Sequence, residues 1–252
     1  MPELPEVEIT KRKLEPLLLG KRILDLGNKK ILKLERRGKA ILIHLSGDKI
    51  FAFHQRMTGK LLVVEKKFKD KYVRFRFKLS SGKDLVFHDV RKFGVMWYGS
   101  AKKVLLDPYF MKLGSDPLEI DFEKFKERLR AHRGMVKPLL LRQDVLAGVG
   151  NIVADESLWE AKIHTRKIIE NLTTQELKRL YQALRYIIVK SIRLGGTTMR
   201  DWLHPDSTEG GYFAKRFIYG RKGEKCRRCG TIIVRTVVGS RGTFICGRCQ
   251  KL

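Results

Sequence analysis

The sequence predicts an α+β fold, in which an N-terminal β-sandwich domain precedes a helical domain that ends in a small cysteine-rich β-hairpin. Three observations predict it. Short apolar runs separated by turn residues fill much of the first hundred positions, helix-type spacing of apolar residues follows, and all four cysteines lie near the end of the chain. The domains are predicted at residues 1–116, 117–218 and 219–252.

The N-terminal domain is predicted to begin with one helix and to continue as strands. Val7, Leu14, Leu17 and Leu18 form the apolar stripe of the helix, which Gly20 ends. Turn segments such as 46–48 and 81–83 separate the apolar runs that follow, which is the rhythm of a β-sandwich. The predicted strands are Ile41–Leu45, Ile50–Phe53, Leu61–Val64, Val73–Leu79, Leu85–Phe87 and Val95–Tyr98.

Two helices are predicted in the second domain. Thr173 and Glu176 have the spacing of a capping box, in which each side chain accepts a hydrogen bond from the other's backbone. Apolar residues at helical spacing follow this box: Leu177, Leu180, Leu184, Ile187 and Ile188. A second helix is predicted over residues 151–161, entered through the turn at 148–150.

The four cysteines have the spacing of a metal site. Cys226, Cys229, Cys246 and Cys249 form two Cys-x2-Cys pairs, and two such knuckles supply four thiolates to a tetrahedral Zn²⁺ ion. An iron–sulfur cluster and a redox dithiol are the alternatives. Because β-prone residues lie between the pairs, we expect one structural zinc in a β-hairpin finger.

The charge balance points to a polyanionic partner. Fifty-four Lys and Arg oppose 27 Asp and Glu, for a formal net charge of +27. Eleven of these cations follow Phe213, where Glu224 is the one acid. Nucleic acid is the leading candidate partner, and a merely basic soluble protein is the alternative.

The sequence has neither a membrane-spanning segment nor a signal peptide that can be recognised, and this bears on the expected compartment. No apolar run approaches the roughly 20 residues that span a bilayer, and the acidic, proline-rich start is unlike a signal peptide. We therefore expect no membrane association and a cytoplasmic protein, in a reducing compartment where cysteines bind metal rather than form disulfides.

The first residues offer a nucleophile. Pro2 is small, so Met1 is expected to be removed, which leaves a secondary amine that is partly unprotonated at neutral pH. Such an amine can attack C1′ of a deoxyribose and form a cationic iminium, and Glu3 could transfer protons beside it. The alternative is ordinary, because Pro and Glu are common in the first turn of a helix.

Motifs along nearly the whole chain resemble the formamidopyrimidine-DNA glycosylase family. No single motif is decisive, but their number and order are specific. They are residues 2–8 (PELPEVE), 36–39 (RRGK), 54–59 (HQRMTG), 89–94 (DVRKFG), 148–151 (GVGN), 195–198 (GGTT), 211–213 (GYF) and 219–224 (YGRKGE), followed by the cysteine knuckles.

The resemblance implies a helix–two-turn–helix domain, a zinc finger and DNA bound in a basic cleft. It implies a bifunctional repair enzyme that excises oxidised purines from duplex DNA and cleaves the strand by β,δ-elimination. Pro2 would be the Schiff-base nucleophile and Glu3 the general acid/base. Lys39 would donate a proton in β-elimination and Arg241 in δ-elimination.

The resemblance also implies a set of DNA contacts. Met57, Arg91 and Phe93 would fill the void that an extruded base leaves, whereas Lys137 and Asn151 would bind phosphates. Without the resemblance, core packing for Met57 and Phe93 and a solvated face for Arg91 would be favoured.

The sequence departs from the family pattern at several places, among them residues 115–117 (SDP), 132–134 (HRG) and the following two. The segment between Gly20 and Lys39 is short, as if one strand–helix excursion were missing, so the sandwich is expected to have a trimmed edge. A DNA-contacting histidine of the family is absent where residues 70–72 (DKY) stand, and that role is not carried over.

Three alternatives remain open from the sequence. The sister family, endonuclease VIII, acts on oxidised pyrimidines, but it usually has Gly where this chain has Leu4. A non-catalytic lesion-binding zinc protein would not need Pro2, Glu3 and Lys39 together. A zinc-ribbon RNA-binding module fits the helical motif poorly. We expect a bacterial-type, nucleoid-associated monomer.

Overall fold

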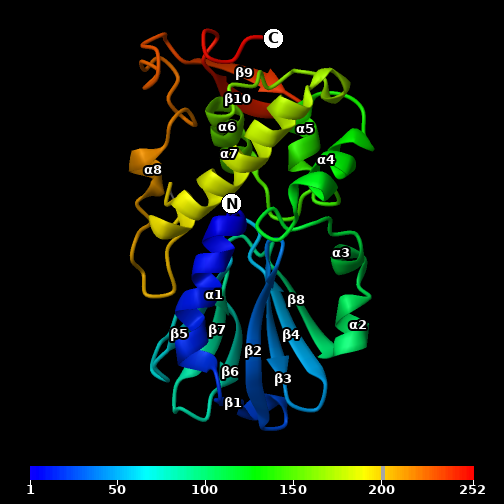
Figure 1. The fold of residues 1–252 in the computed structure, drawn as a ribbon. Helices are drawn as coiled ribbons and strands as arrows, with labels where there is room; N and C mark the ends of the chain where they lie inside the picture. Colours follow the sequence, from blue (N-terminus) through cyan, green and yellow to red (C-terminus); the bar gives the residue numbers. More distant parts are fainter. Residues whose placement is uncertain (200–201) are drawn as a thin grey trace. The chain divides into compact units, whose positions relative to one another are not determined.

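The protein is described by a computed structural model that covers residues 1–199 and 202–252. The chain forms two compact units, and each is described by itself. Unit 1 contains residues 1–112 and 192–213, and unit 2 contains residues 113–191 and 214–252. Figure 1 traces both along the chain.

Unit 1 contains two antiparallel sheets that enclose one core. The five-stranded sheet has the order β1-β2-β3-β4-β8 and the three-stranded sheet the order β5-β7-β6. The β-sandwich prediction is therefore confirmed. The strands are β1 (Arg22–Ile23), β2 (Lys29–Arg37), β3 (Ala40–Leu45), β4 (Lys49–His54), β5 (Lys60–Val64), β6 (Val73–Lys78), β7 (Asp84–His88) and β8 (Val95–Ser100).

Helix α1 (Leu4–Leu18) covers the core of unit 1 and contacts β2, β3 and β5. Val7, Leu14 and Leu18 are fully buried among the inward side chains of both sheets, as predicted. Leu17 is exposed, so its place on the buried stripe was wrong. Pro16 lies within the last turn of the helix, which ends at Leu18 before the non-helical backbone of Leu19.

The strand β2 was not predicted. Its sequence is rich in charge, and a register shift between Ile31 and Lys33 interrupts the alternation that signals a strand. Only Ile31 and Leu34 are buried along it. A short 3₁₀ turn, η1 (Leu24–Leu26), and β1 are the other elements between Gly20 and Lys39.

The chain crosses between the two sheets twice at neighbouring places. It leaves β4 for β5 through residues 55–59, and it leaves β7 for β8 through residues 89–94. Because β4 pairs with β8 and β5 pairs with β7, the two crossovers lie side by side. Two short helices, α2 (Ala101–Leu105) and α3 (Pro108–Met111), follow β8.

Unit 2 begins with helices. They are α4 (Phe122–Arg130), α5 (Val136–Leu141), α6 (Asn151–Glu160) and α7 (Thr174–Arg193), with a 3₁₀ turn η2 (Ile169–Asn171). The predicted capping box is present: the Thr173 backbone N–H donates to the Glu176 carboxylate at 3.0 Å, and the Glu176 backbone N–H donates to the Thr173 hydroxyl at 3.2 Å. No helix of the described residues is both long and apolar enough to cross a membrane.

The last part of unit 2 is the predicted hairpin. It consists of β9 (Val234–Val238) and β10 (Arg241–Ile245), which pair in regular antiparallel register after the short helix α8 (Tyr212–Lys215). Strand β10 packs on α6. The Asp155 carboxylate on α6 accepts a 3.0 Å hydrogen bond from the backbone N–H of Phe244, which fixes the hairpin against the helix.

Candidate active site and zinc centre

Met1 is exposed, whereas the residues that directly follow it are buried. Pro2 and Glu3 are buried, and Glu3 is the N-cap of α1. Its carboxylate accepts the backbone N–H of Glu6, and the Glu6 carboxylate accepts the backbone N–H of Glu3 at 2.8 Å. This capping box holds the Glu3 side chain in one place beside Pro2.

Glu6 is a member of this site that the sequence analysis missed. Its second carboxylate oxygen accepts the backbone N–H of Thr197 at 2.8 Å, in the Gly-Gly-Thr-Thr segment that belongs to unit 1. Burial and the neighbouring Glu3 raise the pKa of Glu6 to about 7. The Glu-x-x-Glu spacing at a helix start was the available signal.

The raised pKa of Glu6 predicts a pH-dependent stability. The folded state binds a proton that the unfolded chain releases near pH 4.5, so stability falls as pH rises from about 4.5 to 7. The shift corresponds to at most about 3 kcal/mol. Urea unfolding across this range should show that decline in the wild type relative to Glu6→Gln, which carries no titrating group there.

Glutamine at position 6 loses one hydrogen bond at every pH, which lowers the stability of the variant by a constant amount. The test is therefore how the free energy of unfolding changes with pH in each protein, and not its absolute value. A difference between the two proteins that stays constant from pH 4.5 to 7 would contradict the assignment to Glu6.

Lys39 lies in the turn between β2 and β3 and is almost fully buried. His54 is part of its surroundings, and burial together with the charges of Arg56 and Lys39 lowers the pKa of His54 to about 3. His54 is therefore neutral at neutral pH. Burial raises the pKa of Tyr109 to about 12, partly offset by a hydrogen bond with the Lys39 backbone.

Met57, Arg91 and Phe93 lie on the two sheet crossovers of unit 1. The side chains of Met57 and Phe93 are exposed by 39% and 52%, so neither packs in the core. The Arg91 guanidinium lies 5.1 Å from the Phe93 ring centroid. The two loops thus present two apolar groups and a planar cation to solvent, side by side.

Asn151 and Arg241 lie close together in unit 2. Asn151 is the first residue of α6, and its amide nitrogen donates to the Gly242 carbonyl at 2.9 Å. Arg241 directly precedes Gly242 and is exposed. The Asn151 side-chain oxygen is buried, with no hydrogen-bond partner among the described residues. This arrangement ties the start of α6 to the start of β10.

Lys137, for which a phosphate contact is expected, is wholly enclosed in unit 2. Its side chain is 0% exposed and its ammonium pairs with Asp155 at 2.6 Å. The same ammonium donates to the Thr243 hydroxyl at 2.6 Å and to the Gly242 carbonyl at 3.2 Å. These contacts hold the start of β10 against α5 and α6, and the phosphate contact of Lys137 stays a prediction.

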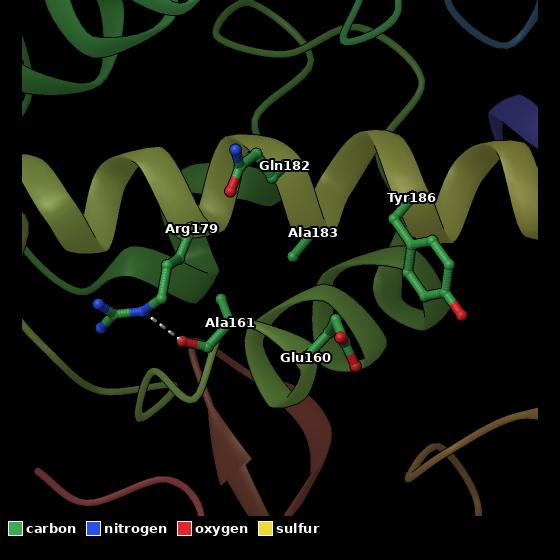
Figure 2. A pocket seen from close by; sticks show the side chains of 6 residues that line it. All are labelled: Glu160, Ala161, Arg179, Gln182, Ala183 and Tyr186. Carbon is green, nitrogen blue, oxygen red and sulfur yellow. Dashed lines mark hydrogen bonds between the residues drawn. The ribbon is translucent and has the colours of Figure 1, made fainter.

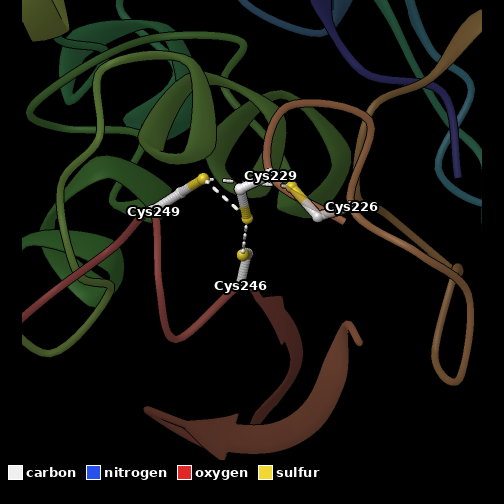
Figure 3. Close-up of side chains that lie close together, drawn as sticks. All are labelled: Cys226, Cys229, Cys246 and Cys249. Carbon is white, nitrogen blue, oxygen red and sulfur yellow. Dashed lines mark hydrogen bonds between the residues drawn. The ribbon is translucent and has the colours of Figure 1, made fainter. Parts of the chain in front are cut away.

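The four cysteines form the predicted metal site, shown in Figure 3. Their sulfur atoms all lie within 4.8 Å of one another, and the described contacts between them span 3.4 to 3.9 Å. Tetrahedral zinc with Zn–S bonds of about 2.3 Å requires sulfur separations of about 3.8 Å. The donor set therefore fits one structural zinc ion, and no ligand position is left open for catalysis.

A surface hollow of about 240 Å³ lies between the end of α6 and α7 (Figure 2). Glu160, Gln182 and Tyr186 line it, and Arg179 donates to the Ala161 carbonyl at 3.3 Å across it. None of the predicted site residues lines this hollow. The candidate chemistry is therefore separate from it.

Three family models match the chain. The formamidopyrimidine-DNA glycosylase N-terminal domain matches residues 24–96, and the H2TH domain of the same family matches residues 113–202. A zinc finger found in Fpg and isoleucyl-tRNA synthetase matches residues 223–252. The three matches follow the order of the two sheets, the helices and the cysteine hairpin.

Relatives and solved structures extend over the full chain. The formamidopyrimidine-DNA glycosylase of Halalkalibacterium halodurans is 36% identical over all of both chains. The crystal structure of the MutM (Fpg) protein of Thermus thermophilus is 36% identical, covers 99% of this chain and 98% of its own, and has a TM-score of 0.90. Lactococcus lactis Fpg, solved with DNA containing N7-benzyl-Fapy-dG, is 35% identical, covers 100% of both and has a TM-score of 0.90.

These matches cover both units and the cysteine site, and they agree with the motifs and geometry described above. This chain belongs to the formamidopyrimidine-DNA glycosylase family.

Proposed function

We propose that the protein is a bifunctional DNA glycosylase and abasic-site lyase that excises oxidised purines, 8-oxoguanine and formamidopyrimidines, from duplex DNA. The observation that carries this is the buried Pro2-Glu3 start of α1, fixed by the capping box with Glu6, in a chain of this family. Family membership favours this reading over the endonuclease VIII, non-catalytic and RNA-binding alternatives.

Pro2 acts as the nucleophile once Met1 is removed. Its nitrogen lone pair forms a bond to C1′, and the electrons of the breaking N-glycosidic bond leave with the damaged base. The product is an iminium between Pro2 and the opened sugar. Glu3, held beside Pro2 by its backbone hydrogen bond, transfers the protons that ring opening and base departure require.

The iminium then drives strand cleavage. Its positive charge acidifies the C2′ proton, whose loss expels the 3′ phosphate in β-elimination, and a second elimination expels the 5′ phosphate. We assign the proton donor roles to Lys39 for the first step and to Arg241 for the second. The burial of Lys39 near a neutral His54 supports the first role.

Extruding the base leaves a void in the duplex. Met57, Phe93 and Arg91 are the side chains that would enter it, and their exposure on two adjacent loops supports this role. Asn151 binds a backbone phosphate at the start of α6, where helix N–H groups favour anions. Lys137 supports that site from within the protein by holding Gly242 and Thr243.

Three further assignments are proposals of the same kind. The domains are residues 1–116, 117–218 and 219–252, as expected from the sequence. The protein acts as a monomer, because one asymmetric site suits one damaged base. It acts in a bacterial cytoplasm at the nucleoid, where its substrate is.

Covalent trapping tests the proposal. The protein is incubated with a duplex carrying one 8-oxoguanine opposite cytosine in the presence of borohydride, which reduces an iminium to a stable crosslink. We expect a crosslink that peptide mass spectrometry places on residue 2. Adding one residue before Pro2 turns its nitrogen into an amide without changing any side chain, and this matched control should give no crosslink.

A panel of lesion duplexes separates the substrate classes. Cleavage of thymine glycol with none of 8-oxoguanine would replace the purine assignment with a pyrimidine one. Tight lesion binding without crosslink or cleavage by zinc-loaded, Met1-free protein would show that the chain is not catalytic.

A further inference from the structure

The two sheet crossovers of unit 1 share one buried carboxylate. Asp89 is 1% exposed and begins the loop of residues 89–94, which carries Arg91 and Phe93. Its Oδ1 accepts a hydrogen bond from the hydroxyl of Thr58 at 2.5 Å, and Thr58 lies in the other loop, residues 55–59, directly after Met57. One side chain thus joins the two loops.

The same carboxylate also shapes its own loop. Oδ2 accepts the backbone N–H of Gly94 at 2.7 Å, and Oδ1 accepts that of Arg91 at 3.2 Å. The Thr58 hydroxyl oxygen also lies 3.2 Å from the Arg91 nitrogen. Both ends of the segment that displays Phe93 are therefore held by Asp89, and one end is held by Thr58 as well.

The backbone at Gly59 and Gly94, near this pair, lies too close to its neighbours to accept a side chain. A Cβ at Gly94 would lie 2.3 Å from the Phe87 ring, and one at Gly59 would lie 2.6 Å from the Gln55 carbonyl oxygen. Arg74 adds a 2.7 Å hydrogen bond from its guanidinium to the Asp89 carbonyl. These contacts hold the base of each loop, while Met57 and Phe93 remain exposed.

We propose that Asp89 and Thr58 are positioning residues that hold both loops in the conformation that enters DNA, before DNA arrives. This rests on the proposed function. A loop that must be ordered during base extrusion lowers the rate of that step, whereas one already ordered does not. The pair therefore acts on base extrusion and not on the chemistry at Pro2.

Thr58→Val tests this with little change of shape, because it removes the hydroxyl and keeps the branched side chain. We expect single-turnover excision of 8-oxoguanine from a duplex to fall about 10- to 100-fold. Cleavage of a preformed abasic site, which has no stacked base to extrude, should fall at most about threefold on the same argument. Thr58→Ser keeps the hydroxyl and should retain wild-type excision.

Asp89→Asn is the second variant, because an amide cannot accept hydrogen bonds from both Thr58 and Gly94 at its two ends. It should show the same selective loss, together with a weaker fluorescence rise of 2-aminopurine placed beside the lesion, which reports unstacking. Ile43→Val, in the core of β3, serves as the control for lost stability.

An equal loss of excision and abasic-site cleavage in both variants, or wild-type excision in Thr58→Val, would overturn the proposal. Failure of the proposed function looks different, because the unmodified protein would then excise no lesion and form no crosslink at Pro2.

Discussion

Replacing Glu3 by glutamine lowers excision of 8-oxoguanine by about 100- to 10,000-fold, the range over which a positioned acid or base contributes to a rate. The glutamine carbonyl still accepts the Glu6 backbone N–H, so the cap of α1 and the burial of Pro2 are kept. What is lost is a group that can take up and release a proton beside the nucleophile. The variant should fold and bind lesion DNA as the wild type does.

The measurement is single-turnover excision beside cleavage of a preformed abasic site. Because that substrate has already lost its base, it needs no proton at base departure, and its cleavage should fall less than excision does. Glu3→Asp is the matched variant, since it keeps the carboxylate on a shorter stem. Unchanged excision in Glu3→Gln would remove Glu3 from the mechanism.

Removing zinc is the second large effect. A structural zinc site of this kind contributes on the order of 10 kcal/mol to the folding of its segment. The hairpin buries few apolar residues apart from those near the cysteines. Chelation should therefore unfold β9 and β10, and Gly242 and Thr243 should leave Lys137 and Asn151.

We expect chelation, or Cys246→Ser, to weaken DNA binding by at least about 100-fold, because the hairpin carries Arg241 and holds Asn151 in place. Fluorescence anisotropy with a labelled duplex measures the loss, and added zinc should reverse it for the chelated protein only. The chain has four cysteines and all are in this site, so thiol titration reports its opening directly. Unchanged affinity with four reactive thiols would contradict the expectation.

Local patterns predicted the parts of the fold that local forces determine. Six strands were predicted because their apolar residues alternate between short turns, and the capping box of α7 because its two side chains lie three residues apart. The zinc site was predicted because each knuckle is a local structure. Pro2 and Glu3 were singled out by a motif, and no periodicity would have shown them.

Local sequence patterns could not predict contacts between residues that are far apart in the chain. Lys137 stands in a helix with nothing to signal burial, and its partner Thr243 is 106 residues away. Glu6 meets Thr197 across 191 residues, and this contact gives the carboxyl its buried surroundings. Asp89 begins a loop motif that was interpreted for its exposed side chains, whereas its own role depends on a second loop 31 residues earlier.

The indole of Trp159 contacts a zinc-site cysteine, so its fluorescence can report on the state of that site. Its N–H donates to the Cys226 sulfur at 3.4 Å, its ring stacks on Phe217, and the Arg228 guanidinium lies 3.8 Å from it. The other two tryptophans, Trp97 and Trp202, belong to unit 1. A Trp97→Phe, Trp202→Phe protein would therefore carry a single tryptophan, and its emission, excited selectively at about 295 nm, would follow the metal occupancy of unit 2 in real time with no dye attached.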